Sequence, residues 1–299
     1  MRELPETVVV RLCDHTAPAV AEAAERLPPH EDHELRSETV QDTLREALRS
    51  VGGDTVETLV GAIRERLDQP PHFAVVTGLC AARADLLLVA LSRFFGVCVE
   101  PYRESWSRLV RHIEARRERL IHRGRPLNEF LHTDGTDWPM PNDYTCLLCV
   151  REDQRGTGES LLIDDGDLVR ELECRDGGAS AVQLLRTEPL PWKVADSLGG
   201  GVVWEPALSE RGLRWLRYTV DLALAEPDVS LEPRVIAALD ATGAAIEASE
   251  RIYRVGLAPG DLLVVDNRRC LHGRTPIVHS ESSQRLLLRT KVARDGAGA

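Results

Sequence analysis

The chain has 299 residues with a formal net charge of −11, and 43% of them are hydrophobic, which is enough for a sizeable buried core. The acidic balance and the 4% content of aromatic residues argue against a nucleic-acid surface or a polybasic membrane contact. No apolar run approaches the length of a membrane span, so the sequence predicts a protein without a transmembrane segment.

The N-terminal residues and the cysteines indicate a cytoplasmic protein. The first residues show no signal-peptide core, and no targeting motif is visible. The seven cysteines are an odd number scattered along a long chain, which does not fit a disulfide framework. Cys146 and Cys149 have the spacing of a redox or zinc pair, but they lie in an apolar run and are predicted to be core thiols.

Residues 1–70 are predicted to form a helical N-terminal segment. Apolar and charged residues recur there at helical spacing, interrupted by Pro28-Pro29 and by Gly52-Gly53. The expected helices cover about residues 16–27, 37–50 and 54–67. An apolar run ending in glycine predicts a buried strand over residues 72–79, and two helices are expected next, over about 82–95 and 104–121.

After Pro126 the pattern changes to short strands and loops. Strands are expected over residues 130–134, 144–150, 160–164, 201–204, 213–220, 262–266 and 285–292, with one Ala-rich helix over 232–249. Residues 166–200 are rich in Gly and Pro and are expected to be an irregular, lid-like insertion. We therefore predict one domain over residues 1–299, mostly β with α, whose core over 72–294 is a β-sandwich or jelly roll with helices packed outside.

A metal site is suggested by three residues from distant parts of the chain. His132 and Asp134 are two positions apart, so on an extended strand their side chains point to the same side. A His-x-Asp pair alone is a weak signal, but His272 lies in a second polar cluster that follows a predicted strand. Two imidazoles and one carboxylate on one face leave three metal positions open, as in non-haem Fe(II) oxygenases.

Further motifs around these residues resemble one known family. The segments that carry the resemblance are Val75–Leu79, His132–Asp134, Gly158–Ser160, Pro259–Asp261, Asp266–Arg269, His272–Arg274, and Arg285 followed by Arg289. In this order they resemble the taurine dioxygenase (TauD/TfdA) and clavaminate synthase-like superfamily of Fe(II)/2-oxoglutarate-dependent oxygenases. The resemblance covers most of residues 72–294 and implies a double-stranded β-helix, the cupin-like form of the jelly roll.

The resemblance also implies cofactors and roles for individual residues. His132, Asp134 and His272 would hold Fe(II), with 2-oxoglutarate and O2 as co-substrates. The far carboxylate of 2-oxoglutarate needs a buried cation, and the fork of an arginine matches a carboxylate bidentately. Arg285 is the first candidate, but the spacing from His272 is one residue shorter than in the amino-acid hydroxylase branch, so Arg289 and Arg274 remain alternatives.

Other residues are candidates for contacts with the co-substrate or the substrate. The hydroxyl of Ser160 could donate to 2-oxoglutarate, and Arg289 could face a substrate carboxylate if Arg285 binds the co-substrate. Asn128, Asp137 and Trp138 flank the ligand motif and could line a substrate pocket, although a structural role in a turn or the core is an equal alternative.

The expected activity is hydroxylation of an unactivated C–H bond of a small polar substrate, with release of succinate and CO2. The resemblance favours an amino acid, free or bound to a carrier, and predicts no nucleic-acid or membrane partner; the oligomeric state is not predicted. The carboxylate of Asp134 argues against halogenation, whereas desaturation, epoxidation and cyclisation remain alternatives. A cupin-like metal-binding protein or a zinc hydrolase is the alternative from another class.

Overall fold

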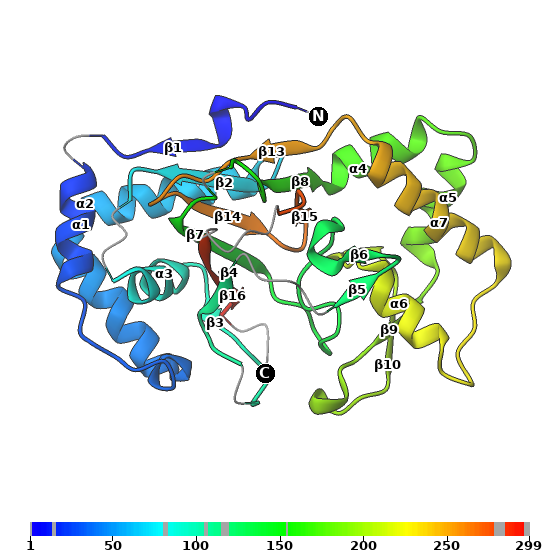
Figure 1. The fold of residues 1–299 in the computed structure, drawn as a ribbon, viewed down its shortest axis with the longest axis horizontal. Helices are drawn as coiled ribbons and strands as arrows, with labels where there is room; N and C mark the ends of the chain where they lie inside the picture. The colour runs from blue at the N-terminus through cyan, green and yellow to red at the C-terminus, as the bar shows by residue number, and fades with distance from the viewer. Residues whose placement is uncertain are drawn as a thin grey trace.

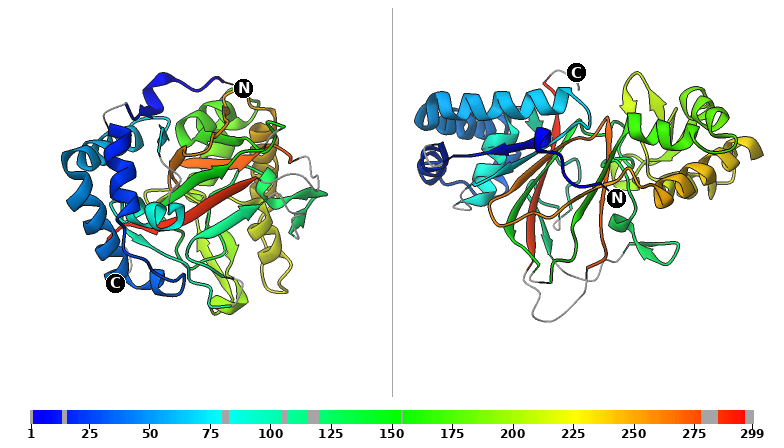
Figure 2. Two further views of the ribbon diagram at one scale, coloured as in Figure 1. Left: turned by 60° about the vertical axis from the view of Figure 1, so that its left-hand side comes forward. Right: turned by 90° about the horizontal axis from the view of Figure 1, so that it is seen from above.

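Helices lie on both sides of two facing β-sheets in this computed structural model (Figure 1). It describes residues 2–13, 16–79, 83–104, 107–114, 120–153, 155–277 and 285–295. Seen from above, the helices of the N-terminal part and those of the C-terminal half flank the sheets on opposite sides (Figure 2). The described α-helices are α1 (Thr16–Glu25), α2 (Glu38–Asp68), α3 (Ala84–Ser92), α4 (Asp165–Glu173), α5 (Gly178–Thr187), α6 (Arg217–Leu224) and α7 (Pro233–Ala248).

The larger sheet is antiparallel apart from its first pair of strands. Its order is β1 (Val9–Arg11), β2 (Phe73–Thr77), β14 (Leu262–Asp266), β7 (Tyr144–Arg151), β16 (Leu286–Ala293) and β3 (Val97–Cys98), and β4 (Arg111–Glu114) also pairs with β16. The smaller sheet has the order β13 (Tyr253–Val255), β8 (Ser160–Asp164) and β15 (Cys270–Arg274). Three two-stranded pairs complete the described strands: β5 (Ile121–His122) with β6 (Arg125–Pro126), β9 (Leu190–Lys193) with β10 (Val202–Glu205), and β11 (Leu208–Ser209) with β12 (Gly212–Leu213).

The layers follow from the alternation of side chains along buried strands. In β14, Leu262 and Val264 pack toward α1–α3, whereas Leu263 and Val265 pack into the space between the two sheets. In β15, Cys270 faces that same space, and Leu271 packs on the opposite side against the core formed with α4–α7. Because successive side chains of a strand point to opposite faces, an apolar run such as Leu262–Val265 of β14 must be covered on both sides.

The predicted N-terminal helices are present. The two helices expected over 37–50 and 54–67 follow one another within the range of α2 and are separated by a kink at Gly53, whose backbone is not helical (φ 49°, ψ −136°). A positive φ is accessible to glycine without strain, so the glycine pair bends the helix where the sequence suggested a break. Buried leucines and valines of α2 then pack on the larger sheet.

Three expected elements are wrong. The basic helix over 104–121 is not formed in its described part, where β4 pairs with β16. The strand over 213–220 is replaced by the end of β12 and the start of α6. Residues 166–200, expected to be irregular, form α4, α5 and β9.

Local chemistry explains the helices of this last segment. The Asp164 side chain accepts a hydrogen bond from the backbone N–H of Asp167 at 2.8 Å, which caps the start of α4. Gly177, at φ 72°, allows the sharp turn between α4 and α5. The glycines therefore separate two helices rather than marking a long loop. None of the described helices has both the length and the apolar character needed to cross a bilayer.

We expect the core between the helices and the larger sheet to dominate stability. Leu148 on β7 is fully buried in that core, whereas Leu222 on α6 is 40% exposed. Leu148→Ala should lower the free energy of unfolding by about 2–5 kcal/mol, because it leaves a cavity. Leu222→Ala is the matched control and should change it by less than about 0.5 kcal/mol in chemical denaturation. Equal losses for the two variants would contradict this assignment of the core.

Candidate metal centre

Two backbone hydrogen bonds bring the predicted ligands together. His272 lies in the middle of β15, and its N–H and C=O pair with those of His132 at 2.8 and 2.9 Å. The strand expected over 130–134 is reduced to this antiparallel bridge, after which the chain turns. The bridge places the two imidazole rings side by side, with their centroids 4.8 Å apart.

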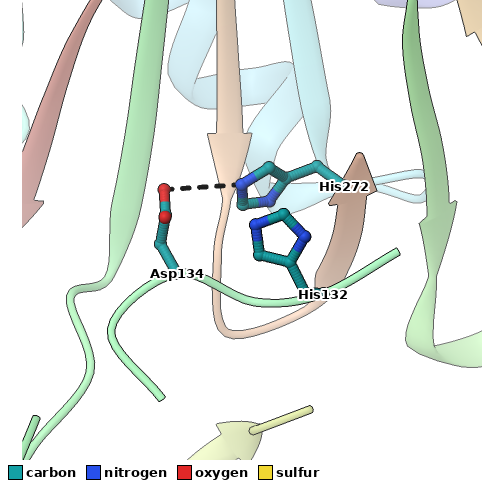
Figure 3. Close-up of side chains that lie close together, drawn as sticks. All are labelled: His132, Asp134 and His272. Atoms are coloured by element: carbon teal, nitrogen blue, oxygen red, sulfur yellow. Dashed lines mark ion pairs between the residues drawn. The ribbon is translucent and has the colours of Figure 1, made fainter. Parts of the chain in front are cut away.

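The three predicted ligands form one buried cluster. His132, Asp134 and His272 are 7%, 5% and 7% exposed. One ligand atom from each residue can be chosen so that all three lie within 4.8 Å of one another. Figure 3 shows the carboxylate of Asp134 facing the His272 ring, with Oδ2 3.4 Å from Nε2, and the His132 ring beside it. A single ion could therefore contact all three side chains.

The protonation of the His132 imidazole suits a metal, and within the described part of the chain the His272 imidazole has a free ring nitrogen. Nδ1 of His132 lies 2.7 Å from the carbonyl oxygen of Phe130, which can only accept, so Nδ1 carries the proton and Nε2 keeps its lone pair. Burial, followed by the nearby His272, lowers the pKa of His132 to about 4, so the ring is neutral at pH 7. Among the described residues, Nδ1 of His272 has no hydrogen-bond partner although it is buried. The donor set of two imidazoles and one carboxylate fits Fe(II).

Asp134 is held in place by two residues outside the expected set of site residues, Asn267 and Thr145. Asn267 accepts from the backbone N–H of Asp134 at 2.7 Å and donates to its carbonyl at 3.1 Å. The Thr145 hydroxyl on β7 donates to Oδ2 of Asp134 at 2.9 Å. Asn267 follows β14 directly, within the Asp-Asn-Arg-Arg cluster, and this cluster was the only sequence signal for its role. Thr145 gave no such signal, because its contact depends on how β7 faces the ligand loop.

Two cations contact the other oxygen of the same carboxylate. Nη1 of Arg289 lies 3.0 Å from Oδ1 of Asp134, and Nζ of Lys291 lies 3.5 Å from it. Burial alone would raise the pKa of Asp134, but the charges of Arg289 and Lys291 hold it well below its usual range. The carboxylate is therefore ionised. Burial lowers the pKa of Lys291, and the charge of Asp134 opposes that shift.

The loop that carries Asp134 is also tied to the C-terminal half. Thr133 donates its N–H to the carbonyl of Trp215 at 2.8 Å, and its hydroxyl accepts from the N–H of Trp215 at 2.9 Å. The fully buried Arg214 donates to the carbonyls of Thr136 and Trp138, both at 2.8 Å. These contacts leave little freedom to the turn after the ligand motif.

A cavity opens directly beside the three predicted ligands. We call it the triad cavity, and it is lined by Ile113, Asn128, His132, Leu147, Ser160, His272, Gly273, Arg274, Arg285, Leu287 and Arg289. Arg285 is buried and donates to the carbonyl of Gly158 at 3.0 Å, close to Ser160 at the start of β8. The predicted co-substrate residues and the predicted ligands thus face a common space.

The remaining sequence candidates fall into two groups. Asn128, Arg274 and Arg289 line the triad cavity, and Arg274 also forms a buried ion pair with Glu129 at 3.3 Å. Asp137 and Trp138 are not among the residues that line it. Asp137 accepts a hydrogen bond from the hydroxyl of Tyr102, and the ring of Trp138 lies 4.4 Å from Nζ of Lys291. Asp137 and Trp138 therefore lie outside the cavity wall, next to Tyr102 and Lys291 respectively.

A jelly roll with two imidazoles and one carboxylate gathered between its sheets is the arrangement of the non-haem iron oxygenases. Comparison with known families agrees with this class. The chain belongs to the taurine catabolism dioxygenase TauD, TfdA family, whose model matches residues 17–291. The resemblance indicated by the motifs is confirmed, and the chain is a member of a dioxygenase class whose cofactors are iron(II) and 2-oxoglutarate.

Individual proteins similar to this chain were also found. Enduracididine beta-hydroxylase from Streptomyces hygroscopicus is 27% identical over 187 residues, which are 55% of this chain and 52% of that protein. The match therefore spans about half the length of that relative. Among solved structures, asparagine oxygenase in complex with Fe(II), hydroxyasparagine and succinate has a TM-score of 0.71 at 22% identity, over 96% of this chain and 93% of that chain.

A second solved structure gives the same result for the fold. The non-heme iron oxygenase OrfP in complex with Fe and alpha-ketoglutaric acid has a TM-score of 0.72 at 20% identity, over 96% of this chain and 94% of that chain. At these identities the likeness establishes the fold. The predicted jelly-roll core with helices packed outside is confirmed.

Thr145 allows a test of how Asp134 is held. Thr145→Val keeps the shape of the side chain but removes the hydroxyl that donates to Oδ2, so Mn(II) affinity of the metal-free protein should fall about tenfold in calorimetric titration. Thr290→Val is the matched control, since Thr290 is equally buried but its hydroxyl pairs with Ser92 on α3 at 2.7 Å. The control should lose about 1 kcal/mol of stability and keep its metal affinity. Equal metal affinities in the two variants would argue against a supporting role for Thr145.

Proposed function

We propose that this chain is an iron(II)- and 2-oxoglutarate-dependent hydroxylase that acts on an unactivated C–H bond of an amino acid or a small amino-acid derivative. The observation that carries the proposal is the buried cluster of His132, Asp134 and His272 beside a cavity lined by Arg285 and Ser160. When bound, iron(II) and 2-oxoglutarate supply the chemistry: one atom of O2 enters the C–H bond, and the other enters the succinate that forms with CO2.

In this proposal the chain's own residues hold and orient the reactants. Nε2 of His132 and Oδ2 of Asp134 point into the cluster because their other polar atoms are held by Phe130, Arg289 and Lys291. Burial of all three ligands excludes bulk water from the reacting centre, which protects the reaction from uncoupled side chemistry. The carboxylate of Asp134 occupies a position that a halogenase leaves to chloride, so we propose hydroxylation rather than halogenation.

Arg285 would bind the far carboxylate of 2-oxoglutarate. Its guanidinium is buried on the cavity wall and is anchored to the carbonyl of Gly158, an arrangement that presents a fixed fork to an anion. A side chain on Gly158 would meet Nε of Arg285 at 3.1 Å, which is consistent with a glycine at this position. Ser160, on the same wall, would donate its hydroxyl to the co-substrate.

Arg289 would contact the carboxylate of the substrate. It lines the triad cavity and reaches Asp134 through Nη1, so its position places a cation next to both the metal and any bound amino acid. Hydroxylases of amino acids are among the similar proteins, which supports this substrate class. Free amino acids of the cytosol are the first candidates, and amino acids bound to a carrier are the second.

The first experiment is visible absorption under anaerobic conditions. Metal-free protein given Fe(II) and then 2-oxoglutarate should develop a weak charge-transfer band only when both are present. His272→Ala should abolish the band, and Arg285→Ala should weaken it, because the co-substrate loses its charged partner. His122→Ala is the control and should keep the band, since His122 packs against Phe130 and Tyr218 instead of the cluster.

The outcome separates the oxygenase from other metal proteins. Formation of succinate from 2-oxoglutarate that depends on Fe(II) and O2 would support the proposal. A well-folded, iron-loaded protein without the band, or hydrolysis supported by Zn(II) instead, would contradict it.

A second experiment tests Arg289 with matched substrates. Once a turned-over amino acid is found, Arg289→Met should raise its KM by about 10–100-fold, the worth of a charge-assisted hydrogen bond. The corresponding α-amide lacks the negative charge, so its KM should change far less in the same variant. Equal changes for acid and amide would show that Arg289 does not recognise the carboxylate.

A further inference from the structure

The two oxygens of Asp134 lie in different environments. Oδ2 faces Nε2 of His272 at 3.4 Å and accepts from the hydroxyl of Thr145 at 2.9 Å. Oδ1 faces away from the two imidazoles, toward Nη1 of Arg289 at 3.0 Å and Nζ of Lys291 at 3.5 Å. A metal held by the two imidazoles would therefore meet Oδ2, while Oδ1 is occupied by cations.

The two cations on Oδ1 are not equivalent. Arg289 lines the triad cavity, with 20% of its side chain exposed, so its guanidinium is within reach of an anion in that cavity. Lys291 lies two residues further on the same face of β16, is 12% exposed, and does not line the cavity. Its ammonium group is directed at Asp134 and lies 4.4 Å from the ring centroid of Trp138.

The choice of lysine at this position is unusual for the chain. The sequence has 37 lysines and arginines in total, and only Lys193 and Lys291 are lysines. Lysine provides a compact charge, whereas arginine provides a planar fork that needs more room and more partners. A compact charge can share Oδ1 with the neighbouring guanidinium of Arg289 without displacing it.

We propose that Lys291 is a positioning residue that keeps Oδ1 of Asp134 away from the metal, so that the carboxylate offers Oδ2 alone. Arg289 shares this task until an anionic substrate draws it into the cavity, and Lys291 then holds Oδ1 by itself. This inference rests on the proposed function. Its consequence is that three metal positions stay open, two for the chelating co-substrate and one for O2. A carboxylate that bound through both oxygens would take one of them.

The test compares the effect of Lys291 with and without Arg289. Mn(II) and 2-oxoglutarate serve as probes in calorimetric titrations of the full chain, so no turnover is needed. The variants are Arg289→Met, Lys291→Met and the two combined, with Lys291→Arg and Lys193→Met each added to Arg289→Met as controls. Lys193 is a suitable control because it pairs with Glu226 at 2.7 Å, in the C-terminal half of the chain.

The expected pattern separates positioning from folding. Adding Lys291→Met to Arg289→Met should weaken 2-oxoglutarate binding to the Mn(II)-loaded protein by about tenfold, because Oδ1 of Asp134 then competes with the co-substrate for one of the open metal positions. Mn(II) affinity and the melting temperature of the Mn(II)-loaded protein should be retained, since the bound ion loses no ligand and supplies a positive charge next to Asp134. In the same background, Lys291→Arg should restore most of the binding, and Lys193→Met should change it by less than about twofold.

Two results would overturn the inference alone. One is unchanged 2-oxoglutarate affinity when Lys291→Met is added to Arg289→Met. The other is a parallel fall of Mn(II) affinity, 2-oxoglutarate affinity and melting temperature, which would assign Lys291 a structural role only. A wild-type protein that binds no 2-oxoglutarate when loaded with Mn(II) is a distinct outcome, because it would overturn the proposed function together with the inference.

Discussion

The backbone bridge between His132 and His272 is the interaction on which the candidate site depends. It joins a loop to the middle residue of β15, and its two hydrogen bonds have lengths of 2.8 and 2.9 Å. The bridge attaches the loop around His132 to β15, a strand that its pairing with β8 already holds in place, and two hydrogen bonds between Thr133 and Trp215 hold the same loop. The bridge also sets the direction of the chain at Asp134, two residues after His132. The side chain of Asn267 then holds the backbone N–H and C=O of Asp134.

Strand β16 connects the stability of the fold to the chemistry of the site. Leu288, Thr290 and Val292 face the helices, where Thr290 pairs with Ser92 and the two apolar residues complete the core. The alternate positions carry Arg289 and Lys291, which face Asp134 between the sheets. Because the side-chain period of a strand is two, a slip of one residue in this strand would exchange the charged face for the apolar one. The packing of Leu288 and Val292 against the helices therefore fixes the register of β16, and this register directs Arg289 and Lys291 toward Asp134.

Much of this arrangement could be predicted from the sequence, since it rests on residue types at fixed spacing. The apolar runs of β2, β7, β8 and β14 gave their positions closely, and the three predicted ligands do come together. One of the wrong elements was decided by a distant partner. The charges of residues 104–121 resemble an exposed helix, but pairing with β16 makes a strand of β4.

The supporting residues of the site could not be predicted for the same reason. Thr145 is opposite Lys291 in the register between β7 and β16, and no sequence pattern in either segment predicts that pairing. Asp137 and Trp138 lie close in sequence to the ligand motif, yet they contact Tyr102 and Lys291 and do not line the triad cavity. The spacing of residues along the chain predicted the metal ligands. The contacts of Thr145 depend on the pairing register between β7 and β16, which the sequence does not reveal.

The central claim is that one metal ion and one co-substrate share the space between His132, Asp134, His272 and Arg285. The most direct measurement is the anomalous diffraction of crystals grown with Mn(II) and 2-oxoglutarate. We expect a single strong peak in contact with both imidazoles and with Oδ2 of Asp134, and a co-substrate whose far carboxylate contacts Arg285. A peak elsewhere, a carboxylate bound through both oxygens, or a co-substrate held by Arg274 instead would contradict it.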